Sequence, residues 1–442
     1  MGLVKDLFKG DRVIWIIFLF LCLISIIEVF SAGSSLTYKS GDHWAPIRQH
    51  SVFLVVGFVI VVLVHNIPSK WFKALPFFLL PLSVILLLFV MAMGFIHPEY
   101  KTNDAARWLS VAGVQFQPSE IAKMAVIIIT AFILSRTQEE KSANPKAFKY
   151  IMWCVGIVFI LIAPENGSTA ALLFGVVFLM MIIGRVPWKQ LAKLGAIILA
   201  TIVLFVAFLR YTPDDILSKI PLGHRFVTWK HRIFTPNSQD SVPAAKFDID
   251  RDAQKAHAHI AIASSNIIGK MPGNSVERDF LPQAFSDFIF AIIIEELGLF
   301  GGGFVVILYI WLLIRAGRIA NKCERTFPAF LVIGITLLLV SQAMLNMMVA
   351  VDLFPITGQP LPLISKGGTS TLINCAYIGM ILSVSREINE QEAALAEEEK
   401  LNAQKEKAKD LLNMAIDMAN EENDEEFDIQ LPEELDYDEN NE

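Results

Sequence analysis

The sequence predicts an all-α polytopic membrane protein with ten transmembrane helices. Of its 442 residues 54% are hydrophobic, and the mean hydropathy is +0.52, which is too apolar for an ordinary soluble globular protein. Mostly apolar runs of about 16–25 residues recur, the length needed to cross a hydrocarbon core about 30 Å thick. These runs lack the alternation of barrel strands, and backbone amides in lipid must bond within their own segment. The runs are therefore expected to be helices.

Ten such runs can be placed along the chain. They cover approximately residues 13–32, 51–67, 74–97, 118–135, 148–164, 169–184, 189–209, 286–315, 328–350 and 367–385. The first run follows basic residues, as in a signal peptide, but no small-residue cleavage pattern follows it, so it is predicted to be a retained helix. A large extracytoplasmic loop, about 210–286, separates the seventh run from the eighth.

The orientation follows from the lysine and arginine residues of the short loops. Those on one side are Lys5, Lys9, Arg12, Lys70, Lys73, Arg136, Lys141, Lys146, Arg185, Lys189, Arg315, Arg318, Lys322 and Arg325. The positive-inside rule makes this side cytoplasmic. Both termini are then cytoplasmic, with 1–12 as the N-terminal segment and 13–386 as the membrane domain.

The net charge of −7 conceals two parts of opposite sign. Residues 387–442 carry 21 acids against 4 lysines, a net charge of −17, whereas the remaining 33 bases and 23 acids give +10. We expect this acidic cytoplasmic tail to be largely disordered and solvated, or alternatively to dock a cytosolic partner. Its first part, 387–419, could instead extend the last helix.

Several classes of function find no support in the sequence. The four cysteines, Cys22, Cys154, Cys323 and Cys375, avoid the outer loop, so neither a disulfide framework nor a CxxC metal site is indicated. There is no GxGxxG, P-loop, HExxH or nucleic-acid module, so no nucleic-acid partner is expected. Any catalytic activity is therefore expected not to use a bound nucleotide.

Polar clusters lie at the outer ends of the helices, and one precedes the fourth helix. Pro118 suits a first helical position, and Glu120 lies in the first turn, where the helix dipole favours an anion. Lys123 follows three residues later and can pair with Glu120 on one face. A capped helix start explains these residues well. It explains Arg107 and Trp108 less well, so both are candidates for binding a substrate.

Two further outer segments carry charge. Glu165 lies in the tight turn "APENGSTA", where Asn166 and Gly167 are needed by the turn itself. The outer loop contains "HRFVTWKHRIFTPN", which brings Arg225 and Arg232 close to aromatic residues. This pattern is typical of an amphipathic segment on a membrane surface, or of one that binds an anionic headgroup. A nucleic-acid site is a poor explanation, because the loop faces away from the cytoplasm.

Irregular backbone is predicted between the last two helices. The segment "MLNMMVAVDLFPITGQPLPLISKGGTS", residues 344–370, has two proline-separated turns and a Gly-Gly pair between apolar helices. Irregular backbone at membrane depth persists only where it is buried in protein or lines a cavity. Lys366 in this segment is a second cation without an evident partner.

The stretch "LPQAFSDFIFAIIIEELG", residues 281–298, has the apolar content of a membrane helix but contains three acids. A helix that begins near Ser286 places Asp287 in its first turn at the outer boundary, where it could be an N-terminal cap or a base with a raised pKa. Glu295 and Glu296 lie deeper. At least one of them must face the bundle, where a cation such as Lys123 or polar side chains would bond it.

These clusters, in this order, resemble the shape, elongation, division and sporulation (SEDS) family of peptidoglycan glycosyltransferases. The most specific matches are "ARWL…QPSEIAK", "FLPQAFSDFIFAIIIEELG" and "LFPITGQPLPLISKGGTS", and the resemblance covers about residues 10–386. Within the family the chain is most similar to the cell-division branch and less similar to the elongation branch.

The resemblance implies a ten-helix fold that polymerises lipid II on the outer face of the bacterial cytoplasmic membrane, at the division septum. The implied partners are lipid II, the nascent glycan strand, a class B penicillin-binding protein that crosslinks the strands, and other division proteins. The family's essential aspartate corresponds to Asp287, its glutamate pair to Glu295 and Glu296, and its helix-four lysine to Lys123.

The sequence departs from the family pattern at several positions. Phe285 stands where the family usually has a polar residue, Glu165 and Asn166 replace the usual Asp-x of the outer turn, and Lys366 replaces a tyrosine. The changed turn is Ser365-Lys366-Gly367-Gly368. We place Ser365, Gly367, Gly368 and Glu120 with the structural residues, and Lys366 with the candidates for headgroup binding.

The implied reaction is an inverting displacement, because an α-linked diphosphate donor gives a β-1,4-linked glycan. In this hypothesis Asp287 takes the proton from the 4-hydroxyl of the acceptor's N-acetylglucosamine. Cations offset the charge on the departing undecaprenyl diphosphate, with Arg107, Lys123, Arg225 and Arg232 as candidates. The sequence neither requires nor rules out a divalent cation, Mg²⁺ or Mn²⁺, in that role.

Two other classes of function fit part of the pattern. Intramembrane acids and lysines with broken helices also describe a lipid II flippase. A non-catalytic division scaffold could recruit partners through the acidic tail. A transporter needs polar residues in both halves of the membrane, whereas these clusters lie mostly at the outer face, and a scaffold has no need of Asp287.

Overall fold

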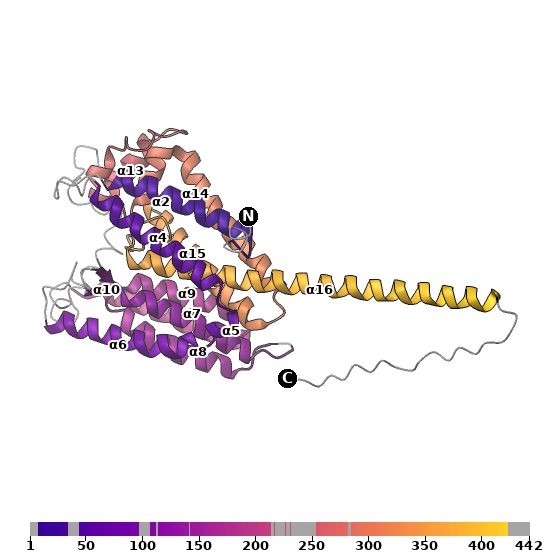
Figure 1. The fold of residues 1–442 in the computed structure, drawn as a ribbon. Helices are drawn as coiled ribbons and strands as arrows, with labels where there is room; N and C mark the ends of the chain where they lie inside the picture. Colours follow the sequence, from indigo (N-terminus) through magenta and orange to yellow (C-terminus); the bar gives the residue numbers. More distant parts are fainter. Residues whose placement is uncertain are drawn as a thin grey trace. The chain divides into compact units, whose positions relative to one another are not determined.

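The computed structural model describes residues 8–33, 44–96, 107–111, 114–140, 142–213, 253–281 and 284–422, together with Ile216, Phe226 and Lys230. Its elements are α2 (Arg12–Ala32), α4 (Ala45–His65), α5 (Ser69–Phe72), α6 (Leu75–Ile96), β1 (Leu109–Val111), β2 (Val114–Phe116), α7 (Pro118–Arg136), α8 (Lys146–Ile162), α9 (Gly167–Ile183), α10 (Trp188–Tyr211), α13 (Ala253–Ser264), η4 (Glu277–Asp279), α14 (Ile289–Lys322), α15 (Thr326–Ala350) and α16 (Thr369–Glu422) (Figure 1).

The predicted all-α membrane fold is confirmed. Each of the ten predicted runs coincides with a helix, and among the described residues seven helices are long and apolar enough to cross a membrane. α9 is a shorter apolar helix, so the number of ten spans stays a prediction. Within the described part of the chain the only sheet is a hairpin in which β1 pairs antiparallel with β2, Leu109 opposite Phe116.

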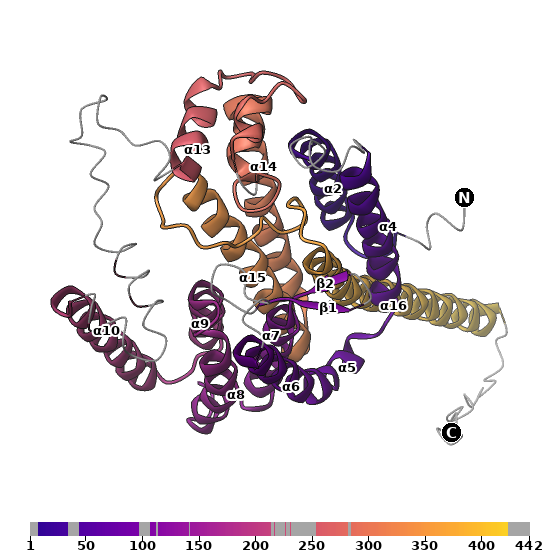
Figure 2. The ribbon, with the colours of Figure 1, turned by 90° about the vertical axis from the view of Figure 1, so that its left-hand side faces the viewer.

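The core of the bundle is formed by α7 and α15. The most apolar stretches of these helices are 78% and 67% buried, against 6% for α10, which lies beside α9 (Figure 2). α15 lies against α14, α7 and α9, while α7 also contacts α6 and α8. α2 packs on α4 and α14. Since lipid is as apolar as the exposed side chains, helices such as α10 need little protein cover.

α14 is interrupted at Gly298, which has φ +73° and ψ −177°. The backbone there is bonded to the preceding outer segment instead of to its own helix. Lys270 N and Met271 N donate to the carbonyls of Glu295 and Glu296 at 2.9 and 2.8 Å, and Phe300 N donates to Ile267 O at 3.2 Å. An interrupted membrane helix is tolerated when neighbouring groups satisfy the freed backbone in this way.

The chain divides into two compact units, Met1–Glu387 and Ile388–Glu442. In the second unit the structure has a helix, the last part of α16, as far as Glu422. This agrees with the expectation that the first part of the tail, 387–419, extends the last helix. Residues 423–442 of the acidic tail lie outside the described part.

We expect Gly298→Ala to destabilise the fold, because only glycine adopts this backbone conformation readily and an added Cβ would lie 2.2 Å from Ile267 O. The midpoint of thermal unfolding in detergent should fall by an amount that corresponds to about 2 kcal/mol or more. Gly303→Ala, in the same helix with open space around the added Cβ, is the matched control and should unfold no earlier than the parent. Equal midpoints for the two variants would contradict the argument.

Candidate active site

The sequence clusters of the predicted outer face come together where α7, α9, α14 and α16 begin. Ser168, at the start of α9, donates to Thr357 O at 2.8 Å, and Thr369, at the start of α16, donates to Gln115 O at 3.2 Å. Lys366 N donates to Phe285 O at 3.0 Å, which joins the segment before α16 to the turn before α14. Four positive helix ends thus lie around one region.

Asp287 lies in a turn before α14 and does not cap that helix. The N-cap is Phe288, which makes no side-chain cap hydrogen bond, so the capping hypothesis for Asp287 is wrong. The half-buried carboxylate accepts from Ser286 Oγ at 3.0 Å, and a Cβ built on Gly358 would lie 3.6 Å from Asp287 Oδ2. Burial raises the pKa of Asp287, while the Ser286 hydrogen bond and the charge of Arg107 lower it in part.

The turn that contains Asp287 is fixed by hydrogen bonds that its backbone carbonyl groups accept from other segments. Asn346 Nδ2 donates to Asp287 O at 2.9 Å, and Ser365 Oγ donates to Ser286 O at 2.7 Å. Together with the bond from Lys366 N to Phe285 O, three consecutive carbonyl groups of the turn have fixed partners. The carboxylate itself remains available, because none of these bonds uses it.

The predicted irregular backbone before α16 is exposed at 353–355 but mostly buried from 359 to 365, and it is bonded by side chains from four helices. The carbonyl groups of Thr357, Gln359, Pro360, Pro362 and Ile364 accept from Ser168 (2.8 Å), Asn346 (2.8 Å), Gln342 (3.0 Å), Tyr309 and Ser25 (2.6 Å), respectively. These donors lie on α9, α15, α14 and α2. The segment therefore has a defined path although it is not helical, and it forms the wall beside Asp287.

Lys123 is part of this scaffold and is not open to a headgroup. Its ammonium pairs with Glu120 Oε1 at 2.8 Å, as the spacing predicts, and donates to Gln342 Oε1 at 3.0 Å. Lys123 is 1% exposed and Glu120 3%. Gln342 in turn donates to Pro360 O, so the ion pair supports the irregular backbone.

Glu295 and Glu296 are fully buried, and neither pairs with Lys123, so that suggested partner is wrong. Glu295 Oε1 accepts from Lys270 Nζ at 2.7 Å, and Glu296 Oε1 lies 3.8 Å from Arg278 Nη1. Both carboxylates also bond Ser275, through its hydroxyl or its amide. The pair attaches the outer segment to α14 beside the interruption at Gly298.

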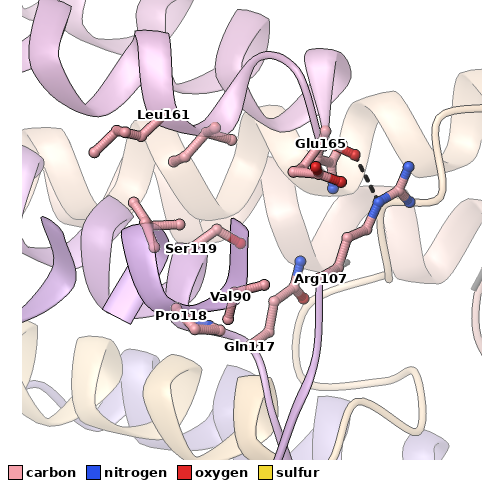
Figure 3. A pocket seen from close by; sticks show the side chains of 10 residues that line it. Val90, Arg107, Gln117, Pro118, Ser119, Leu161 and Glu165 are labelled. Atoms are coloured by element: carbon pink, nitrogen blue, oxygen red, sulfur yellow. Dashed lines mark hydrogen bonds between the residues drawn. The ribbon is translucent and has the colours of Figure 1, made fainter. Parts of the chain in front are cut away.

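Arg107 lines a pocket between α6, α7, the end of α8 and the turn before α9 (Figure 3), and its charge also lowers the pKa of Asp287. Its Nε donates to Glu165 O at 2.7 Å. The pocket is lined by Val90, Arg107, Gln117, Ser119, Ile162 and Glu165, among others. The Ser119 hydroxyl is buried and has no hydrogen-bond partner among the described residues. Trp108, beside Arg107, is 40% exposed.

The remaining predicted residues differ in their placement. The half-buried Lys366 holds its ammonium 5.5 Å from the centre of the Phe285 ring, and burial lowers its pKa. Gly368 has φ +52°, and Gly367 lies so close to Ser370 Oγ that a Cβ would not fit. Arg225 and Arg232 lie outside the described residues.

No group of three or more His, Cys, Asp or Glu side chains that could hold a metal ion occurs among the residues that the structure describes. A divalent cation therefore stays an untested hypothesis for this site.

Several residues of the site were not found from the sequence. Ser286, Gln342, Asn346 and Gly358 all bond or contact the Asp287 turn or its wall. A signal was present for two of them, because Gln342 and Asn346 are four residues apart in an otherwise apolar helix and so share one face. Gly358 carried no signal, since its role depends on the path of the irregular backbone.

Known proteins with similar sequences agree with the resemblance. A curated relative named "Probable peptidoglycan glycosyltransferase FtsW" from Burkholderia thailandensis is 31% identical over 380 residues, which cover 82% of this chain and 76% of the relative. One of the same name from Halomonas elongata is 30% identical over 377 residues, or 83% and 88% of the two chains.

Solved structures show the same fold. A chain from a structure described as "Structural coordination of polymerization and crosslinking by a peptidoglycan synthase complex" superposes with a TM-score of 0.66 at 21% identity, covering 86% of this chain and 99% of that one. The rod shape determining protein RodA of Thermus thermophilus superposes with a TM-score of 0.57 at 20% identity, covering 86% and 98%.

A family model matches nearly the whole membrane body. It is described as "Cell cycle protein", carries the names FtsW, RodA and SpoVE, and covers residues 11–390. The family that the three sequence motifs indicated is thereby confirmed, and the chain belongs to the FtsW/RodA/SpoVE family of cell cycle proteins.

Proposed function

We propose that this chain is a peptidoglycan polymerase of cell division. It transfers the growing glycan from its undecaprenyl diphosphate carrier to lipid II, on the outer face of the cytoplasmic membrane. Its curated relatives are named as glycosyltransferases of the same kind. The observation that carries the proposal is the placement of Asp287, whose carboxylate is half-buried and unused by the scaffold, while three consecutive carbonyl groups of its turn have fixed partners.

Asp287 is suited to act as a general base. Burial raises its pKa above the ordinary value, which makes the carboxylate a stronger base than an exposed aspartate. The fixed turn holds the carboxylate in one orientation. In the reaction it accepts the proton of the acceptor's 4-hydroxyl as that oxygen attacks the donor sugar from the face opposite the leaving diphosphate.

The leaving group develops negative charge, and the surroundings of Asp287 are positive. The N-terminal ends of α7, α9, α14 and α16 and the guanidinium of Arg107 all favour an anion there. The pocket beside Arg107 also offers the unpartnered Ser119 hydroxyl at the start of α7, which a phosphate oxygen could satisfy. A divalent cation bound to the diphosphate would add positive charge of the same kind.

The position of the polar groups favours a polymerase over a flippase. A transporter moves its cargo through both halves of the membrane and needs polar contacts along that path. The candidate substrate contacts here, Asp287, Arg107 and Lys366, all lie where helices begin at the predicted outer face.

The remaining parts of the proposal concern partners and location. A crosslinking class B penicillin-binding protein and other division proteins would act with this chain at the septum, with both termini in the cytoplasm. The positive-inside pattern supports the orientation, and the division role rests on the curated relatives named FtsW.

Replacing Asp287 by Asn should abolish polymerisation while leaving the fold intact, because the amide keeps the shape but cannot take a proton. Glycan strands made from purified lipid II are measured for the parent and the variant, with and without the penicillin-binding partner. We expect a loss of at least about 10²-fold. Asp279→Asn, an exposed acid of the preceding segment, is the control and should keep its activity.

Near-normal strand synthesis by the Asp287→Asn variant would refute the assignment of the base. No strands from the parent, even with the partner present, would favour the flippase or the scaffold hypothesis.

The pH dependence should report the environment of Asp287. Activity requires the ionised carboxylate, so it should fall with decreasing pH at a value above the ordinary range of an aspartate. Ser286→Ala removes a hydrogen bond that lowers the pKa of Asp287. The acid limb of the pH profile, where activity falls with decreasing pH, should therefore move to higher pH in this variant. An unmoved limb would mean that another group controls it.

Arg107→Gln should reduce kcat by about 10²- to 10³-fold if Arg107 stabilises the leaving diphosphate. Arg107→Lys should retain an intermediate activity, because it keeps the charge but loses the planar array of donors. Steady-state rates with lipid II test both variants. Arg210→Gln, which removes an exposed charge at the end of α10, controls for a general loss of positive charge. Equal losses for Arg107→Gln and Arg210→Gln would contradict a specific role.

A further inference from the structure

The outer helix α13 lies beside α14 and near α15 (Figure 2), and it is bonded to the segments that follow α15 and precede α14. On one side Lys255 Nζ lies 2.9 Å from Asp352 Oδ1, and His259 Nε2 lies 3.8 Å from Asp352 Oδ2. Lys255 and His259 are four residues apart and so share a helix face. On another side His257 Nδ1 lies 2.6 Å from Glu277 Oε2, and its ring stacks on Phe280.

Asp352 lies between α15 and the irregular backbone, and both its backbone and its side chain are bonded. It has φ +58°, a left-handed conformation that aspartate and asparagine tolerate better than most residues. Its side chain is 15% exposed and that of Lys255 25%, so the pair is shielded more than an ordinary surface ion pair. Asp352 N also donates to Val349 O at 3.1 Å, just after the end of α15 at Ala350.

Five residues separate Asp352 from Gly358, the residue that faces the carboxylate of Asp287. Between them Leu353 N and Phe354 N donate to Met348 O at 2.8 and 3.3 Å, and Ser168 donates to Thr357 O. Asp352 is the residue of this stretch whose side chain pairs with α13. On the other side of the site, Glu277 accepts from Leu281 N at 2.9 Å, a few residues before the Asp287 turn. α13 is thus the element that both segments share.

We propose that Lys255 is a positioning residue for the reaction of Asp287. Through its ion pair with Asp352, it holds the 352–358 segment against the Asp287 carboxylate and keeps water out of that contact. Lys255 does not touch the reacting atoms. The inference rests on the proposed function for its effect on catalysis, but the effect on the segment itself is independent of any activity.

The consequence for Asp287 follows from the physics of burial. Loosening the segment lets water reach the carboxylate, which favours its charged form and weakens it as a base. The charged groups that face Asp287 are Arg107, from the segment before β1, and Lys366, from the segment before α16, whose ammonium lies over Phe285. Arg107 donates to Glu165 O and Lys366 N donates to Phe285 O, so both should stay in place when the ion pair is removed.

The test compares Lys255→Gln, Asp352→Asn and the double variant in the full-length protein. Asparagine keeps the left-handed backbone and the side-chain shape at 352, so only the charge is lost. We expect kcat with lipid II to fall by about tenfold in each single variant, with little change in KM and no further loss in the double variant. The acid limb of the pH profile should move to lower pH. Lys255→Arg should restore the parent behaviour.

A second measurement does not require activity. Hydrogen exchange should be about two- to fivefold faster in residues 353–358 of the Lys255→Gln variant, and unchanged in the segment 266–271 that is bonded to α14. Asp279→Asn is the control in both measurements. Parent-like exchange in 353–358 overturns the inference, whether or not the parent polymerises lipid II.

The two proposals fail in different ways. A parent that forms strands, together with Lys255→Gln and Asp352→Asn variants of full kcat and unmoved acid limb, overturns the positioning role and leaves the polymerase intact. An active Asp287→Asn variant overturns the polymerase mechanism, while faster exchange at 353–358 would still support the attachment of this segment by Lys255.

Discussion

The site depends on one constraint, the need to satisfy backbone carbonyl groups where the chain is irregular inside a membrane protein. An unpaired carbonyl in such surroundings costs several kcal/mol, so the segment before α16 can exist only where donors meet it. Ser25, Ser168, Tyr309, Gln342 and Asn346 supply those donors from four helices. The polar side chains in the core are thus the reason that the Asp287 wall has a single path.

The same requirement separates the acids of the site by role. Glu120, Glu295 and Glu296 are each buried and each accept hydrogen bonds or a cation, so their charges are compensated by the scaffold. Asp287 differs because its carboxylate has only the hydroxyl of Ser286 among the bonds that the structure records. A buried carboxylate with few partners destabilises the folded state, so such a group is rarely kept for structure alone. Its perturbed pKa is typical of a catalytic acid or base.

The positive environment of Asp287 comes from helix ends as well as from side chains. Four helices begin around the site, and their N-terminal ends contribute partial charges fixed by the fold. Arg107 adds a full charge that reaches both Asp287 and the pocket. A diphosphate carries its charge on several oxygens, so distributed positive charge suits it better than a single cation would.

The sequence by itself determined the membrane fold, the helices and the acid of interest, because span length and apolar content depend on local composition alone. It also indicated the Glu120–Lys123 pair, whose partners are one helical turn apart. Only the tertiary structure decided that Asp287 precedes α14 without capping it, that Lys270 and Arg278 are the partners of the glutamates, and that Gly358 faces the carboxylate. These contacts join residues distant in the chain, and their geometry follows from where the irregular backbone finds its donors.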